Sequence, residues 1–314
     1  MARRVTASMR WLLVMAAVRG RQVFEVPKYK FDFTSETKSA ARHSQCGAPQ
    51  VLSASIRKRL HFYAMVSSED PALLRHFLAF YAARGVVFKE PGRARIVVHP
   101  PLNMSNPKHR ATHRILAAVH AANVHQSTVF SSEIKRDGAN SYLEELQEDA
   151  FLMFPDLDEF FDAPSVEIEH ILKRYGLVLG HMVDRIAEDW SLARTTDKPL
   201  WTQYPRRCAV TAALFHGANT KWMLVPRSVR FATAHHLVEK VTVPPSVPFS
   251  HYRFTRASGV LLQTKRDLYV QRGLTKNRTE GRAHIYDVAL AYVERGGLSA
   301  SFRKKVRCGT ACNS

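Results

Sequence analysis

The sequence predicts an α/β fold in which a mostly parallel, Rossmann-type sheet carries helices on both faces. Two observations lead to this prediction. Between residues 60 and 160, apolar runs typical of buried strands alternate with segments whose apolar residues recur at helical spacing. Acidic residues also follow directly after an apolar run, at the strand ends where ligands bind such sheets.

The first ordered unit is expected to be a strand at residues 61–67 followed by a helix. Asp70 can cap that helix, Pro71 suits its first position, and Gly85 supplies its end. Further strands are expected at residues 95–99, 124–130 and 151–154, and further helical segments at residues 109–124 and 142–147.

The pattern changes after Pro164. A helix is expected at residues 166–175, strands at 177–186, 207–215 and 222–231, a proline-marked loop at 244–248, and helices at 257–272 and 283–294. The simplest domain division is a targeting or poorly ordered segment at 1–55, one α/β domain at 56–280, and a C-terminal helix with a basic tail at 281–314.

The net charge of +19 is unusual for a chain in which charged residues make up 23%. It permits binding to nucleic acid, binding of an anionic nucleotide by an enzyme, or a general solubility bias. The excess is spread along the chain and no familiar nucleic-acid-binding motif is present, so no nucleic-acid partner is expected.

The N-terminal segment and the cysteines bear on the cellular compartment of the protein. The arginine-rich start with an apolar run at 11–18 resembles either a short signal peptide or an organelle transit peptide. Four cysteines allow one or two disulfides if the chain enters a secretory lumen.

The segment FLMFPDLDEFF at residues 151–161 carries the most chemical information. An apolar strand runs into Asp156 and Asp158, and residues two apart in an extended chain point the same way. Paired carboxylates at a strand end suit Mg²⁺ or Mn²⁺, which usually share their ligands with a substrate phosphate. The alternative is an exposed turn or a helix-capping acid.

Other polar residues lie at the ends of the first two predicted strands, where a ligand of such a sheet is expected to bind. Ser67 and Glu69 follow the first strand, and His99 ends the second, so they are candidates for nucleotide contacts. A helix cap, or a structural histidine, explains them equally well.

A sugar transfer with inversion needs a carboxylate base, and Asp184, Glu188 and Asp189 follow a strand-like run. A salt-bridged turn is the alternative reading. His251 is a candidate for completing the metal site, with His235 or His236 next; the basic pairs at 206–207 and 265–266 could contact a diphosphate or be solvated surface.

Several strings taken together resemble glycosyltransferases of the GT-A fold, in the group related to glycosyltransferase families 2 and 92. They include FYAMVSSEDPALLRHFLAFYAARG, RIVVHP, FPDLDEFF, MVDRIAEDWSLA and SHYRF, and they extend over residues 60–275. The resemblance implies a sugar-nucleotide donor, a divalent metal, and a luminal or membrane-bound setting. It places Asp156 and Asp158 at the metal and diphosphate, with His251 as a further ligand.

The sequence therefore predicts a glycosyltransferase that uses Mn²⁺ or Mg²⁺ and moves a sugar to a glycan, lipid or protein hydroxyl. The expected location is the secretory pathway, specifically the Golgi, with possible membrane association; an organelle is the alternative. A metal-dependent phosphoesterase or nuclease is one rival function, although two-metal sites need more acids. A non-catalytic basic nucleic-acid-binding protein is the other; it explains the charge but leaves the strand-end acids without a role.

Overall fold

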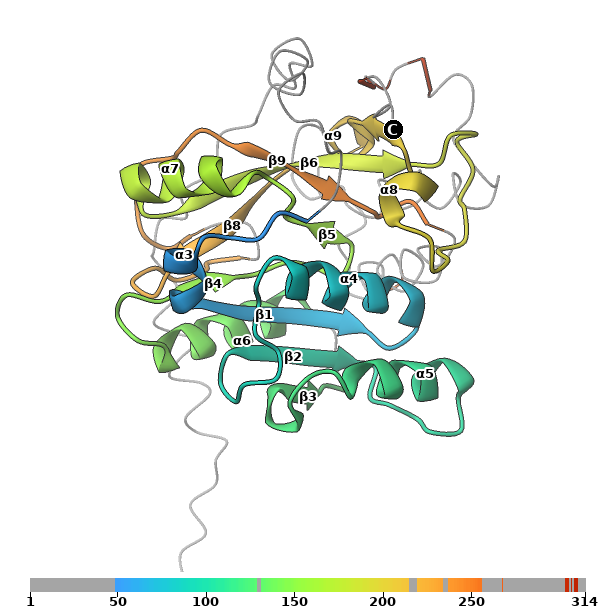
Figure 1. Cartoon of the computed structure of the whole chain (residues 1–314), viewed down its shortest axis with the longest axis horizontal. Coiled ribbons are helices and arrows are strands. Elements are labelled where there is room, and N and C mark those ends of the chain that lie inside the picture. Colours follow the sequence, from blue (N-terminus) through green and yellow to red (C-terminus); the bar gives the residue numbers. More distant parts are fainter. Residues whose placement is uncertain are drawn as a thin grey trace, which may run out of the picture.

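The computed structural model describes residues 49–128, 131–214, 219–233 and 237–255, together with residues 267, 303, 304, 306, 308 and 309. The described strands form one nine-stranded sheet (Figure 1). They are β1 (Leu60–Ser67), β2 (Ala94–His99), β3 (Val124–Gln126), β4 (Phe151–Met153), β5 (Glu159–Phe160), β6 (Val178–Ile186), β7 (Arg206–Cys208), β8 (Thr220–Pro226) and β9 (Val247–His251). Their order is β3-β2-β1-β4-β8-β6-β9-β5, and β7 pairs with β6.

Among the described strands, β1, β2, β3, β4, β6 and β9 run in one direction. β1 pairs in parallel with β2 and β4, β2 pairs in parallel with β3, and β6 pairs in parallel with β9. β8 is antiparallel to both β4 and β6, while β5 and β7 are antiparallel to their partners. The sheet is mixed but mostly parallel, so the prediction of an α/β fold with a mostly parallel sheet is confirmed.

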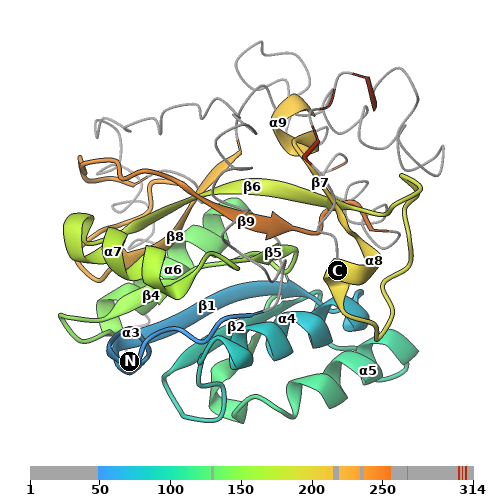
Figure 2. The same ribbon diagram turned by 45° about the horizontal axis from the view of Figure 1, so that its top comes forward.

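Helices cover both faces of this sheet, as predicted. On one face, α3 (Ala54–Arg59), α4 (Pro71–Ala83), α5 (Pro107–Leu116) and α7 (Ser165–Tyr175) contribute to a large apolar core with β1 and β2. On the other face, α6 (Ser132–Glu145) packs Tyr142 and Leu143 against a cluster containing Phe154 and Trp222. Figure 2 shows α4 and α5 side by side beneath β1 and β2.

Local signals explain where α4 begins and ends. The Asp70 carboxylate accepts a hydrogen bond from Leu73 N–H at 3.0 Å, and Pro71 occupies the first turn. Gly85 follows the helix with φ of +98°, a conformation that glycine adopts at little cost. The predicted cap and stop are therefore confirmed.

Several of the predicted elements differ from the structure. The strands expected at 124–130 and 222–231 end earlier, at Gln126 in β3 and at Pro226 in β8. The strand expected at 207–215 is the short β7 followed by helix α9 (Val210–Leu214), and the loop expected at 244–248 leads into β9. The helix expected at 109–124 ends at Leu116, before a 3-10 turn at Ala121–Asn123, and the piece expected at 142–147 belongs to the longer α6. The helices expected at 257–272 and 283–294 lie outside the described residues, apart from Asp267. The short helix α8 (Leu200–Gln203) completes the described elements.

Gly138 explains how α6 can lie so close to the sheet. A Cβ atom at this position would lie 2.2 Å from Tyr63 Oη and 3.0 Å from Tyr63 Cζ. Tyr63 is buried in β1, and its rigid ring cannot move away from α6 without disturbing its neighbours. Glycine is therefore required by packing, although it is a poor residue inside a helix.

Because of this packing constraint, the effect of Gly138→Ala on the free energy of unfolding should have the opposite sign to that expected from helix propensity. Helix propensity alone expects Gly138→Ala to stabilise the protein by about 1 kcal/mol. Because the added methyl group meets Tyr63, we expect a loss of about 1–3 kcal/mol in the free energy of unfolding. Denaturant unfolding of Gly138→Ala should show this loss, and at least half of it should disappear in the Tyr63→Phe background. A stabilised Gly138→Ala single variant would contradict the packing described here.

Candidate functional site

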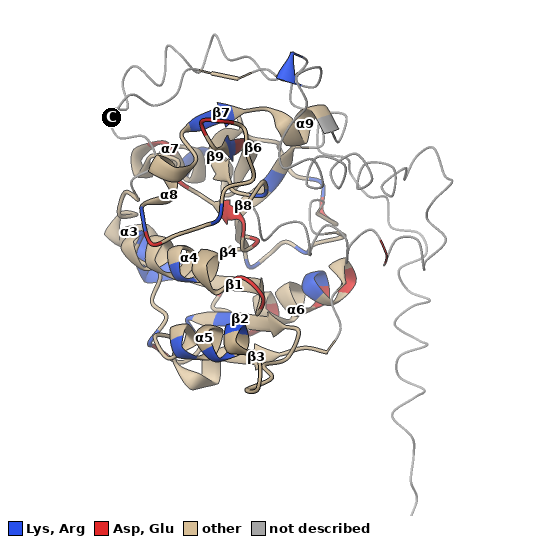
Figure 3. Cartoon of the chain, turned by 90° about the vertical axis from the view of Figure 1, so that its right-hand side faces the viewer, with Lys and Arg blue, Asp and Glu red and all other residues tan. Residues whose placement is uncertain are grey.

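The residues predicted to form a site lie at one edge of the sheet. Ser67 is the last residue of β1, His99 the last of β2, and His251 the last of β9, while Asp184 lies near the end of β6. Asp156 follows β4 by three residues. Because these strands run in the same direction, their carboxyl ends meet at the edge where α/β sheets bind ligands. In Figure 3, acidic positions of the chain (red) lie beside β4 and β8, whereas Lys and Arg positions (blue) are spread over several helices.

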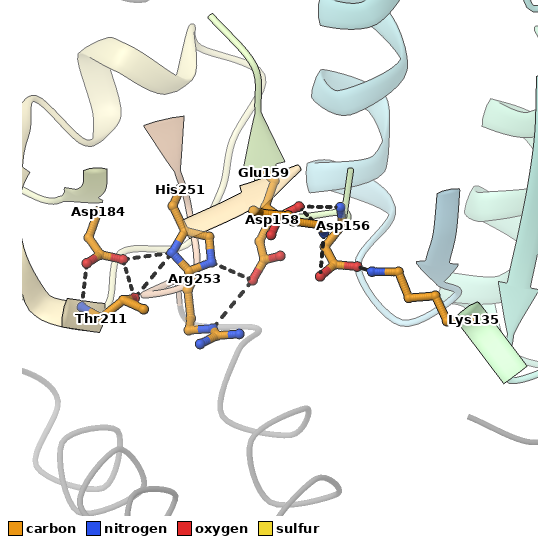
Figure 4. Close-up of polar contacts among 9 residues, drawn as sticks. Lys135, Asp156, Asp158, Glu159, Asp184, Thr211, His251 and Arg253 are labelled. Atoms are coloured by element: carbon orange, nitrogen blue, oxygen red, sulfur yellow. Dashed lines mark hydrogen bonds and ion pairs between the residues drawn. The ribbon is translucent and has the colours of Figure 1, made fainter. Parts of the chain in front are cut away.

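The chain between β4 and β5 is a turn rather than an extended strand. The prediction that Asp156 and Asp158 point at one place is therefore wrong, since that prediction needed strand geometry. Figure 4 shows the two carboxylates directed to different partners. Each aspartate has to be considered by itself.

Asp158 belongs to a chain of polar contacts that ends inside the protein. Its Oδ2 lies 3.3 Å from His251 Nε2 and 3.7 Å from Arg253 Nε. His251 Nδ1 lies 2.7 Å from Asp184 Oδ1. Asp184 also accepts hydrogen bonds from Thr211 N–H at 2.5 Å and from the Thr211 hydroxyl at 2.6 Å (Figure 4). Asp184 and His251 are buried, whereas the Asp158 and Arg253 side chains are each 17% exposed, so this chain of contacts reaches solvent at Asp158 and Arg253.

Asp156 has lysine partners instead. Its carboxylate contacts Lys135 of α6, and its Oδ2 lies 3.1 Å from Nζ of Lys221 in β8. Lys221 also contacts the buried Glu159 carboxylate. The backbone N–H of Asp156 donates to Glu159 Oε2 at 2.7 Å, and the Glu159 N–H donates to the Asp156 carbonyl at 3.0 Å.

The surroundings of His251 favour its protonated form. Burial lowers the pKa of His251, but the nearby charge of Asp158 and the hydrogen bond to Asp184 raise it by more, so the net shift of the pKa is upward. When His251 is protonated, its imidazolium balances one of the two carboxylates beside it. A metal ion at Nε2 would have to displace this proton.

The donor atoms fit a divalent cation with two protein ligands. Asp158 Oδ2 and His251 Nε2 are 3.3 Å apart, and neighbouring ligands of one octahedral ion are about 3 Å apart. Asp184 accepts the Nδ1–H of His251, and a carboxylate in this position fixes the orientation of a metal-binding histidine. Across the described part of the chain, no three His, Cys, Asp or Glu side chains converge as a complete metal site, so substrate phosphate and water would have to supply the other ligands.

The first two parallel strands carry a second polar cluster. Glu69 Oε1 lies 2.7 Å from His109 Nε2, and Lys108 Nζ lies 3.5 Å from Glu69 Oε2. Burial raises the pKa of Glu69, but the hydrogen bond and charge of His109, followed by Lys108, lower it overall. Ser67 accepts the Glu69 N–H at 3.1 Å, and His99 Nδ1 lies 3.0 Å from the Ser127 carbonyl. Glu69, with 37% of its side chain exposed, is thus a fixed, ionised acceptor at this edge.

The three predicted base candidates do not gather at one place. Asp184 is fully buried and its carboxylate is occupied by Thr211 and His251, so the expectation that it faces an acceptor is wrong. Glu188 is largely exposed, and its Oε1 is 2.5 Å from Arg206 Nη2. Asp189 accepts the Ser191 N–H at 2.9 Å in an exposed turn. The salt-bridged turn considered as an alternative therefore describes Glu188 better.

A cavity of about 250 Å³ lies on the other side of the β5–β9 ladder. Phe160 and Tyr252 line it, and they alternate with Glu159 and His251, which face the charged residues. The remaining lining comes mainly from α4 and from the segment around α8, and much of it is apolar. This cavity is therefore separate from the carboxylate site.

Sequence reasoning missed Lys135, Lys221 and Thr211. Lys221 had a usable signal, because a lysine at the start of the apolar run in β8 is a buried charge that needs a partner. Its partners are 62 and 65 positions away in the sequence, so spacing could not identify them. His235, His236 and the basic pair at 265–266 lie outside the described residues.

One disulfide joins Cys208 of β7 to Cys308. Cys46 and Cys312 lie outside the described residues. In the part of the chain that the structure describes, no helix has the length and hydrophobicity needed to cross a membrane.

The chain has only distant similarity to known proteins. No protein-family model matches the chain, and no curated protein matches it. One similar solved structure is 4-diphosphocytidyl-2C-methyl-D-erythritol synthase, at 13% identity over 54% of this chain and 75% of the other, with a TM-score of 0.28. Another is residues 1–349 of S. aureus TarS, at 12% identity over 74% of this chain and 70% of the other, also with a TM-score of 0.28. At these TM-scores neither likeness carries an argument about this chain.

The raised pKa of His251 predicts a pH-dependent stability. A group whose pKa is higher in the folded protein stabilises it fully below the unfolded value of about 6.5, and this contribution is lost as pH rises through the folded pKa. Asp158→Asn removes the main attraction on the imidazolium. In EDTA we therefore expect wild type to exceed Asp158→Asn by about 1–3 kcal/mol near pH 5.5, with a smaller difference at pH 9.

Urea unfolding at several pH values measures this difference. Asp149→Asn, an exposed change between α6 and β4, is the matched control and should follow wild type throughout. A difference between wild type and Asp158→Asn that is constant or grows with pH would show that His251 is not held as an imidazolium.

Proposed function

We propose that this protein is a metal-dependent glycosyltransferase of the GT-A type, which transfers a sugar from a nucleotide-sugar donor to an acceptor hydroxyl. The observation that carries the proposal is the approach of Asp158 and His251 at the carboxyl edge of a mostly parallel sheet. Asp158 is the solvent-facing end of a buried, oriented chain of contacts. This arrangement suits a cation that is shared with a ligand.

Asp158 and His251 would hold Mn²⁺ or Mg²⁺, and Asp184 would keep the imidazole in place through Nδ1. When bound, the ion supplies charge that stabilises the departing nucleotide diphosphate. Arg253 lies beside Asp158 and can add a positive charge to the same anion. The excess basic charge of the whole chain favours the approach of an anionic donor.

The nucleoside part of the donor is assigned to the ends of β1 and β2. Glu69 offers an ionised acceptor for hydroxyl groups, and Ser67 and His99 lie on neighbouring strands of the same edge. Hydrogen bonds from donor hydroxyls to a fixed carboxylate would give affinity and orientation. The acceptor is a glycan, lipid or protein hydroxyl.

A secretory setting accords with the disulfide between Cys208 and Cys308, since such bonds persist in oxidising compartments. We therefore assign the protein to the secretory pathway, with the Golgi as the specific compartment.

Donor binding should depend on the metal. We expect a nucleoside diphosphate with Mn²⁺ to raise the melting temperature of the full chain, because a ligand that binds only the folded state stabilises it. The shift should vanish in EDTA and in Asp158→Asn, while Asp149→Asn should retain it. Equal stabilisation with and without metal would contradict the proposed site.

Product analysis then tests the reaction. With the matching nucleotide sugar and acceptor, we expect release of nucleoside diphosphate together with a glycosylated acceptor. Release of phosphate from nucleotides without sugar transfer would instead support the phosphoesterase alternative. Salt-sensitive nucleic-acid binding without nucleotide-sugar binding would support the basic binding protein.

A further inference from the structure

Two buried lysines surround the first aspartate of the acidic turn. Lys221 is fully buried in β8, and only 5% of the Lys135 side chain in α6 is exposed. Both ammonium groups also lie over the Phe154 ring, at 4.6 Å for Lys135 and 5.3 Å for Lys221 from the ring centroid. Two elements distant in sequence therefore bring positive charge to the same turn.

The charges in this group balance. Lys135 and Lys221 are each paired with Asp156, and Lys221 is also paired with Glu159, which gives two cations and two anions. Buried charges need partners, because an unpaired ion loses its hydration without compensation. Asp156 thus leaves no uncompensated negative charge for a metal ion.

The same group fixes the shape of the turn. The Glu159 carboxylate accepts the Asp156 N–H, and the Glu159 N–H donates to the Asp156 carbonyl. On the far side of the turn, the Tyr252 N–H donates to the Asp158 carbonyl at 2.7 Å. The turn is therefore held at both ends, and the Asp158 side chain is directed to His251.

We propose that Lys135, Lys221, Asp156 and Glu159 form a lysine clamp, a positioning device that uses Asp156 as a structural counter-ion and leaves Asp158 to bind the cation. This inference rests on the proposed function, because it concerns how the cation site is built. The two aspartates of the motif have different tasks: Asp156 anchors the turn to α6 and β8, and Asp158 with His251 contacts the ion.

Matched substitutions of the two aspartates test the clamp. Asn at position 156 keeps an oxygen for a lysine, so the turn should persist. We expect Asp156→Asn to lower the melting temperature but to keep the Mn²⁺ dissociation constant within about threefold of wild type. Asp158→Asn should weaken Mn²⁺ binding by at least about tenfold.

Electron paramagnetic resonance of Mn²⁺ supplies both the affinity and a signature of the ligands. Nitrogen hyperfine coupling from a histidine should be present in wild type and Asp156→Asn and absent in His251→Gln. Loss of Mn²⁺ binding in Asp156→Asn as severe as in Asp158→Asn would overturn the inference. Tighter Mn²⁺ binding in Lys135→Met would also overturn it, because the lysine would then be competing with the metal for Asp156.

A second measurement keeps the clamp testable if Asp156→Asn does not fold or if wild type binds no Mn²⁺. Lys135→Met, Asp156→Ala and the double variant are compared by thermal unfolding in EDTA. The double variant should lose less than the sum of the two single losses, because the charges act as a pair. Additive losses would contradict the clamp. Coupled losses with no Mn²⁺ binding by wild type would retain the clamp as a structural device, contradict its role in building a cation site, and show that the proposed function had failed.

Discussion

Pairing of buried charge across the turn between β4 and β5 is the constraint on which the rest of the site depends. Glu159, Lys221, Asp184 and His251 are all almost completely buried, and each has an oppositely charged or hydrogen-bonding partner within contact distance. Removing water from an ion costs several kcal/mol unless such partners replace it. These pairings hold the turn, β6, β8 and β9 in one arrangement.

This arrangement divides the carboxyl edge into two electrostatic parts. Around Asp156 the charges are compensated by the ammonium groups of two lysines. Around Asp158 the compensating charge comes from His251 and Arg253, and a histidine proton can be exchanged for a metal ion. The Asp158 side chain is less exposed (17%) than the Asp156 side chain (33%), so the histidine partner, and not access to solvent, distinguishes the second part.

The sequence allowed the fold class to be predicted because each signal was local. The cap at Asp70, the glycine after α4 and the period of the apolar residues depend on neighbours within one helical turn. β9 was missed because Pro248 lies inside it and argued for a loop. The β7–α9 segment was missed because its apolar run is short enough to suit either a strand or a helix.

The sequence identified most of the residues of the site, but it did not reveal how they are arranged. Asp156, Asp158, Asp184 and His251 were all named from the sequence, and the structure brings the last three into one chain of contacts. The partners that decide their roles lie far away in the sequence: Lys221 is 65 positions from Asp156, and His251 is 67 positions from Asp184. Burial of Asp184 follows from the central position of β6 between β8 and β9, which only the sheet order reveals.

The most direct test of the central claim is to locate the cation by anomalous diffraction from crystals of the full chain grown with Mn²⁺ and a nucleoside diphosphate. The account predicts one Mn²⁺ peak in bonding contact with both Asp158 and His251, with phosphate oxygens completing its ligands and Asp156 still held by Lys135 and Lys221. A Mn²⁺ ion bound to Asp156, or a bound diphosphate with no Mn²⁺ beside Asp158, would contradict it.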